Sequence, residues 1–174
     1  MATVQRRVPT HQYEPWMRHA IDLARTHTPP SDDPPVGALV YDCDGNLLGQ
    51  GHHDRPGTGD PTAFAELTAL REAAQKLGGW RLEGCTVVTT LEPGVMAAGA
   101  LVLARVQRLV IGSWDPYQGA VCSQWDLVRD RRLNHRLEVV SEVLTTETDP
   151  LVADYLVHEQ YQAEQRRIDM KLGL

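Results

Sequence analysis

The sequence predicts an α/β domain in which helices are layered on a β-sheet. The chain has 174 residues, of which 42% are hydrophobic and 23% charged, and helical apolar patterns alternate with short β-branched runs. A chain of this length buries a core without disulfide or metal support, and such alternation is typical of layered α/β folds. We therefore expect one domain over residues 1–174, with residues 1–12 as a flexible N-terminal tail.

The first third of the chain predicts a helix followed by a β-hairpin. Apolar residues recur at helical spacing over residues 14–27, and Pro15 suits a first helical turn. A cluster of helix breakers over 28–35 ends this helix. Two apolar runs follow, at 36–41 and 47–51, and the turn-forming pair Asp44 and Gly45 separates them, which indicates a hairpin.

The rest of the chain continues the alternation. Residues 52–61 are rich in Gly, Pro and Asp and are expected to form a loop, after which Thr62 is expected to cap a helix. A β-branched run then predicts a buried strand, and Pro93 opens the helix that follows it. The ranges that we expect are helices at 62–77, 94–105 and 149–170 and strands at 85–91, 109–111 and 137–140.

Charge and cysteine content restrict the function classes. The formal net charge of −6 and the pI near 5.6 argue against a protein that neutralises a phosphate backbone, so nucleic acid is an unlikely partner. Cys43, Cys85 and Cys122 fit neither a disulfide framework nor a CxxC metal site, which favours a reducing cytoplasm. No apolar run approaches the length of a membrane span, so we expect a soluble protein.

Three segments carry a family resemblance. They are PVGA at 35–38, DPTAFAE at 60–66 and TLEPGVMA at 90–97. In order and spacing they resemble the cytidine and nucleoside deaminase superfamily, in its tRNA-adenosine and guanine deaminase branch. The resemblance implies a three-layer α/β/α fold with a central mixed five-stranded sheet, and a homodimer.

The same resemblance points to a lost metal site. In the family, H-x-E and P-C-x-x-C supply one His and two Cys to zinc, while the Glu moves protons. Here Phe64 stands at the His position and Gly94 and Ala97 at the Cys positions, although Glu66 and Pro93 remain. A benzyl group, a hydrogen and a methyl group offer no lone pair to zinc. We therefore expect no metal at these positions, and no cofactor.

Three hypotheses for the function follow. The first is a zinc-independent, repurposed enzyme that uses Glu66 as general acid or base on a small heterocyclic or nucleobase-like metabolite. The second is a catalytically inactive pseudo-deaminase that serves as a binding or dimer-partner subunit. The third is a nucleoside, guanine or tRNA-adenosine deaminase with an atypical metal site, for which His52, His53, Asp60 and Cys122 are the donors to consider.

Contacts with the ligand are expected from residues near the motifs. We expect the Phe64 ring to fill part of the space that the metal would take, so that Glu66 faces an apolar wall and holds a proton. A carboxylate favoured by the helix dipole is the plainer interpretation of Glu66. His53 is either a ligand contact or a solvated loop histidine. The residues expected to contact the substrate are His53, Phe64, Ala65, Gly94, Trp114 and Asp115.

Overall fold

The computed structural model describes residues 10–26 and 33–172, and the elements follow the predicted order. The N-terminal tail was predicted over residues 1–12; residues 1–9 lie outside the described residues, and Thr10–Tyr13 forms a 3-10 helix, η1. The helices are α1 (Glu14–Thr26), α2 (Arg55–Thr58), α3 (Ala65–Leu77), α4 (Val95–Leu103) and α5 (Thr145–Leu172). The strands are β1 (Gly37–Tyr41), β2 (Leu47–His52), β3 (Thr86–Leu91), β4 (Arg108–Ser113) and β5 (Glu138–Val140).

The five strands form one mixed sheet, which confirms the predicted fold class. Their order is β2-β1-β3-β4-β5. The strand β1 is antiparallel to both β2 and β3, whereas β4 runs parallel to β3 and to β5. Strands β1 and β3 are buried at each position, so the centre of the sheet has helices on both faces.

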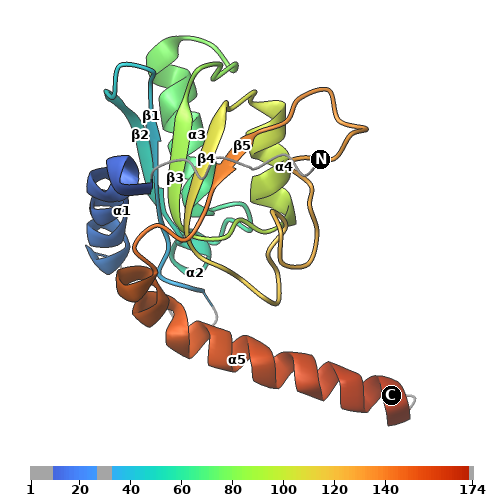
Figure 1. The fold of residues 1–174 in the computed structure, drawn as a ribbon. Coiled ribbons are helices and arrows are strands. Elements are labelled where there is room, and N and C mark those ends of the chain that lie inside the picture. Colours follow the sequence, from blue (N-terminus) through green and yellow to red (C-terminus); the bar gives the residue numbers. More distant parts are fainter. Residues whose placement is uncertain (1–9, 27–32, 173–174) are drawn as a thin grey trace, which may run out of the picture.

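The two faces of the sheet carry separate hydrophobic clusters (Figure 1). On one face α1 packs Met17 and Ile21 against Leu39 and Val88. On the other face α3 and α4 cover a larger cluster, which Val152 of α5 also joins. The three layers α/β/α are therefore those that the family resemblance implied.

Close packing of α3 on β2 depends on two glycines. A Cβ atom on Gly51 would lie 2.3 Å from the carbonyl oxygen of Ala65, and one on Gly49 would lie 2.2 Å from that of Ala69. Real Cβ atoms do not approach backbone oxygens so closely, so both positions need glycine for steric reasons. The first turn of α3, which carries Glu66, is thereby held directly against the sheet.

Several local details differ from the prediction, and α5 begins at Thr145 and not at residue 149. The helix α3 begins at Ala65 and not at Thr62, because the backbone N–H and the hydroxyl of Thr62 both donate to Asp60 Oδ1, each at 2.7 Å. Phe64 takes the N-cap position without a side-chain hydrogen bond. In the predicted loop, Asp54 caps the short helix α2 by accepting from the Gly57 N–H at 3.1 Å.

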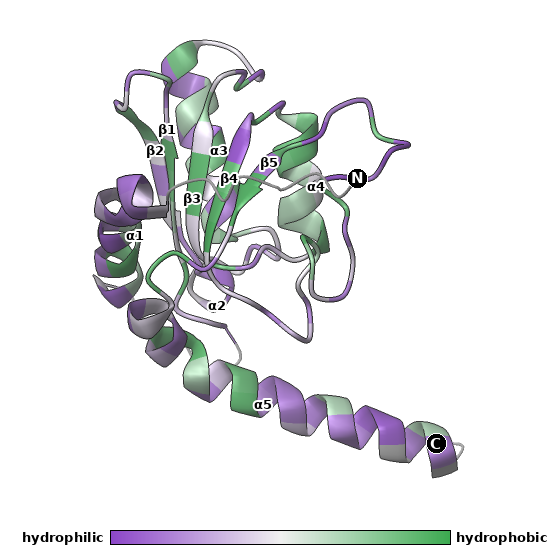
Figure 2. Cartoon of the chain, in the orientation of Figure 1, coloured by the Kyte–Doolittle hydropathy of each residue, from purple (hydrophilic) through white to green (hydrophobic). Residues whose placement is uncertain are grey.

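The helix α5 extends well beyond the sheet (Figure 1). Its first turns pack on the domain, and most of the projecting part is hydrophilic (Figure 2). Within residues 10–26 and 33–172, no helix combines the length and the apolar character that crossing a bilayer requires. In contrast, α4 is apolar throughout (Figure 2) and exposes Val95, Met96 and Leu103.

Candidate functional site

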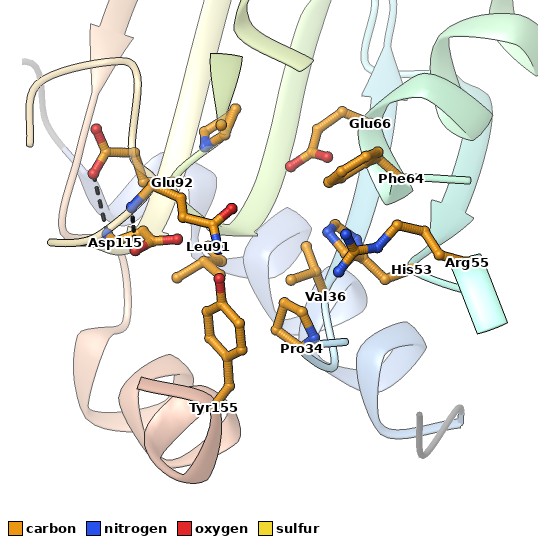
Figure 3. Close-up of a pocket in the computed structure, with 13 residues that line it drawn as sticks. Pro34, Val36, His53, Arg55, Phe64, Glu66, Leu91, Glu92, Asp115 and Tyr155 are labelled. Atoms are coloured by element: carbon orange, nitrogen blue, oxygen red, sulfur yellow. Dashed lines mark hydrogen bonds between the residues drawn. The ribbon is translucent and has the colours of Figure 1, made fainter. Parts of the chain in front are cut away.

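A pocket opens where the ends of β1, β2 and β3 meet the first residues of α3 and α4. Figure 3 shows Arg55, Phe64 and His53 on one side of it and Glu92, Asp115 and Tyr155 on the other, with the carboxyl of Glu66 directed into the space between. The cavity volume is about 30 Å³, which is room for roughly one or two water molecules. The lining residues are Pro34, Val36, His53, Arg55, Phe64, Glu66, Leu91, Glu92, Pro93, Gly94, Asp115, Gln118 and Tyr155.

Phe64 is held from two directions. The His53 ring meets it edge-on, with 5.0 Å between ring centroids and an interplanar angle of 79°. The Arg55 guanidinium lies over its face, 4.9 Å from the centroid, a distance at which the cation and the ring attract each other. Asp33 fixes this guanidinium, with a 2.8 Å ion pair. The aromatic face that borders the pocket is thus covered by a paired arginine.

His53 is a neutral, buried ring whose orientation is set by the backbone. Its Nδ1 accepts a hydrogen bond from the Ala65 N–H at 3.1 Å. Burial, and then the positive charge of Arg55, lower the pKa of His53 to about 3. Because Nδ1 is the acceptor of the neutral ring, the proton resides on Nε2. His53 therefore offers the pocket a hydrogen-bond donor and no charge at neutral pH.

Glu66 is buried in the first turn of α3, and only one of its oxygens has a partner. The Thr89 hydroxyl lies 2.8 Å from Oε1, whereas Oε2 has no hydrogen-bond partner among the described residues. The side chain is 2% exposed. Burial raises the pKa of Glu66, against the weaker opposing effects of its own backbone N–H and Thr89. The carboxyl group is directed into the pocket, where Oε2 can form one hydrogen bond with a ligand.

The raised pKa of Glu66 predicts how Glu66→Gln changes stability with pH. The pKa of the folded state lies above the ordinary value of 4.5, so wild type loses stability as pH rises from the unfolded pKa towards the folded one. The neutral amide of Glu66→Gln does not titrate. We expect the stability of the variant relative to wild type to increase as the pH rises above about 4.5. Urea unfolding at several pH values measures this difference, and a difference that stays constant would contradict a raised pKa of Glu66.

Glu92 is equally buried but fully hydrogen-bonded. Its Oε1 accepts from the backbone N–H groups of Val121, Cys122 and Ser123 at 2.7–3.0 Å. Its Oε2 accepts from the Asp115 N–H at 3.1 Å and from the Ser123 hydroxyl. With donors on both oxygens, Glu92 fixes the loop after β4 against the end of β3.

The opposite wall of the pocket joins the same loop to α5. Asp115 Oδ1 accepts from the N–H groups of Tyr117 and Gln118 at 2.9 and 3.0 Å. Burial raises the pKa of Asp115, and burial together with the charge of Asp115 raises the pKa of Tyr155. Tyr155 is 6% exposed and contributes its ring from α5, about forty residues further along the chain.

The pocket brings together most of the residues that the sequence singled out. His53, Phe64, Glu66, Gly94 and Asp115 line it, but their contacts with a substrate stay a prediction. The structure places three others elsewhere. Ala65 and Ala97 are buried in the first turns of α3 and α4, and Trp114 packs partly buried against the core.

Several lining residues were not predicted from the sequence, and Arg55 and Tyr155 are the most prominent of them. Arg55 lies in a segment that was read as an irregular loop, and Tyr155 lies in a helix whose position in space cannot be inferred from its pattern. Neither residue belongs to one of the three motifs. The only signal for Arg55 was its place two residues after His53.

The donors needed for zinc are not assembled in the part of the chain that the structure describes. Among these residues no group of three or more His, Cys, Asp or Glu side chains is placed to hold a metal ion. The structure therefore does not bring together the atypical set His52, His53, Asp60 and Cys122. The Cys122 thiol is exposed on the loop after β4.

Comparison with known proteins identifies the relatives of this chain. The family described as "Cytidine and deoxycytidylate deaminase zinc-binding region" matches residues 10–113. The tRNA-specific adenosine deaminase of Haemophilus influenzae is 36% identical over 159 residues, which cover 91% of this chain and 90% of the relative. That of Bacillus subtilis is 37% identical over 144 residues, covering 83% and 88%.

Solved structures give the same relationship. One from a study of A-to-I editing by tRNA:A34 deaminases at the wobble position has a TM-score of 0.69 and 33% identity, and the match covers 75% of this chain and 98% of that one. The guanine deaminase of Bacillus subtilis is more distant, with a TM-score of 0.53, 30% identity and coverage of 59% and 65%.

These relatives correct the functional expectations drawn from the sequence. The hypothesis of a zinc-independent enzyme for a small metabolite is wrong, and so is the alternative of an inactive dimer-partner subunit, because the relatives that match nearly end to end are tRNA-specific adenosine deaminases. The expectation that nucleic acid is an unlikely partner is contradicted by the same similarity. Net charge describes the whole surface, whereas RNA contacts can be confined to a small part of it.

Proposed function

We propose that this chain, which belongs to the cytidine and deoxycytidylate deaminase family and to its branch of tRNA-specific adenosine deaminases, acts on an adenine base of tRNA. The observation that carries this proposal is similarity along nine-tenths of both chains to a relative of that name. Enzymes that modify a nucleobase take it out of the stack and read it by stacking and hydrogen bonding in a pocket.

The pocket offers both kinds of contact to a base. Phe64 provides an aromatic face, and stacking of a base on an aromatic ring contributes about 1–3 kcal/mol. His53 provides a fixed N–H donor, and Glu66 an acid whose Oε2 has no partner among the described residues. The His53 N–H and the Glu66 carboxyl group can both form hydrogen bonds with the edge of a base.

Entry of a base requires a side chain to move. The cavity of about 30 Å³ is smaller than a purine ring, and Arg55 covers the Phe64 ring. The Arg55 side chain is 35% exposed, and its movement towards solvent breaks the 2.8 Å ion pair that holds it to the buried Asp33 carboxylate. A base that stacks on Phe64 takes the place of the guanidinium, which then lies near the RNA phosphates as a charged donor.

The base stack is tested by replacing Phe64 with leucine, which keeps an apolar side chain but removes the aromatic face. We expect Phe64→Leu to weaken binding of a labelled anticodon stem-loop with adenosine at the wobble position by at least about fivefold. Fluorescence anisotropy at fixed salt measures the dissociation constant, because RNA affinities depend strongly on ionic strength.

Trp80 is the matched control for this experiment. It also has an arginine over its ring, with Arg81 4.9 Å from the centroid, but it is 62% exposed and does not line the pocket. Trp80→Leu should leave the affinity unchanged. Equal effects of the two substitutions, or no binding of the stem-loop by folded wild type, would contradict the proposal.

The homodimer implied by the resemblance stays a prediction. The exposed side of α4 formed by Val95, Met96 and Leu103, which are 47–70% exposed, supports self-association because exposed apolar patches of this kind mark contact surfaces.

A further inference from the structure

The zinc ligand positions of the family are occupied here by side chains that cannot bind a metal. Phe64 precedes α3 and Gly94 precedes α4 as N-cap residues, and Ala97 lies in the first turn of α4. Zinc in such sites is coordinated by lone pairs of imidazole nitrogen and thiolate sulfur. Because a phenyl ring, a hydrogen atom and a methyl group have no such lone pair, no change of rotamer supplies one.

The polar groups that remain near the pocket are already engaged. His53 uses Nδ1 for the Ala65 N–H, and its Nε2 carries a proton. Both oxygens of Glu92 accept hydrogen bonds from the loop after β4, and Asp115 Oδ1 accepts two more. Glu66 has one oxygen without a hydrogen-bond partner among the described residues, and a single carboxyl oxygen does not make the three or four ligands of a zinc site.

The side chains around Phe64 make contacts that depend on its aromatic ring. His53 packs edge-on against it and Arg55 lies over its face. The guanidinium is held there by its 2.8 Å ion pair with Asp33. Phe64 therefore does more than remove a ligand, because its contacts with His53 and Arg55 stabilise the pocket without a metal.

The backbone that would carry the ligands is nevertheless retained. A Cβ atom on Gly94 would meet only the Gln118 carbonyl oxygen, at the ordinary contact distance of 3.5 Å. Ala97 is 1% exposed, in the helix turn that Gly94 begins. Both Gly94 and Phe64 line the same cavity, and Glu66 is directed into it.

We infer that this chain holds no zinc in the pocket, and that the loss is confined to three side chains on a scaffold that can still carry the metal. The triple variant Phe64→His, Gly94→Cys, Ala97→Cys should therefore acquire a zinc site. This inference concerns metal binding alone, so it stands or falls separately from the binding of tRNA.

The first measurement is the metal content of untagged protein by inductively coupled plasma mass spectrometry. Wild type should contain far less than one zinc per chain, and a chelator should leave its melting temperature unchanged. The triple variant should contain close to one zinc per chain, and the chelator should lower its melting temperature. Stoichiometric zinc in wild type would overturn the first half of the inference.

If the triple variant folds poorly, a second variant tests whether the scaffold can still carry a metal. The double variant Gly94→Cys, Ala97→Cys retains Phe64 and its contacts with His53 and Arg55. It should bind cobalt(II) with the charge-transfer absorption of thiolate ligands, whereas Gly94→Ser, Ala97→Ser, which has no sulfur at these positions, should not. Folded Cys variants that bind neither zinc nor cobalt would show that the scaffold no longer supports the metal.

Discussion

Gly51→Ala is expected to destabilise the protein by at least about 3 kcal/mol, because the added methyl group has no space. Its carbon would lie 2.3 Å from the Ala65 carbonyl oxygen, 2.7 Å from Thr68 Cβ and 2.9 Å from the Ala69 N–H nitrogen. Two of these atoms are helix backbone, so relief requires α3 to move away from β2. For a domain of this size the melting temperature should fall by roughly 6–12 °C.

Gly79→Ala and Gly99→Ala are the controls for this prediction. A Cβ atom at either position meets no atom within 4 Å. Gly99 lies inside α4, where alanine is favoured over glycine by about 0.5–1 kcal/mol. We expect both controls to fold at least as stably as wild type in urea unfolding. A Gly51→Ala variant as stable as these controls would show that α3 does not approach the sheet as closely as described.

Glu92→Gln is expected to cost about 2–4 kcal/mol, because an amide cannot accept the hydrogen bonds of a carboxylate on both atoms. The N–H groups of Val121, Cys122 and Ser123 can still reach the amide oxygen. The amide nitrogen would then face the Asp115 N–H, which donates to Oε2 in wild type at 3.1 Å. Two donors would face each other at a buried position, and the loop after β4 should loosen.

Glu66 provides the comparison within the same protein. Both glutamates are 2% exposed, but one is surrounded by donors and the other has an oxygen without a partner. Glu92→Gln should therefore destabilise the protein at neutral pH. The stability of Glu66→Gln relative to wild type should be higher at neutral pH than in acid. Chemical denaturation of the two variants side by side measures the contrast. Similar losses of stability in both would contradict the difference in hydrogen bonding between Glu92 and Glu66.

The sequence could predict the elements because their signals are local. Apolar spacing marks α1, an apolar run marks β1 and a β-branched run marks β3, each within a residue or two of the observed ends. The start of α3 was misplaced because Thr62 has the right chemistry for a cap but uses it on Asp60. Whether such a side chain bonds to a helix N–H group or to a neighbouring side chain cannot be inferred from the sequence pattern.

The site could be predicted only where motifs mark it. Phe64, Glu66 and Gly94 were identified because they occupy positions of a known signature. Arg55 and Tyr155 enter the pocket through the placement of α2 and α5 in space, and no local pattern carries that information. The error about nucleic acid has a different origin, since a net charge of −6 is a sum over the chain and does not describe the mouth of one pocket.

The central claim is that an adenine base of tRNA enters the pocket beside Phe64. The most direct measurement places 2-aminopurine, a fluorescent analogue of adenine that is quenched by stacking, at the wobble position of an anticodon stem-loop. Added wild-type protein should change the fluorescence saturably as the base leaves the RNA stack, and unlabelled stem-loop with adenosine should reverse the change. Binding of the stem-loop without any change in this fluorescence would contradict the account.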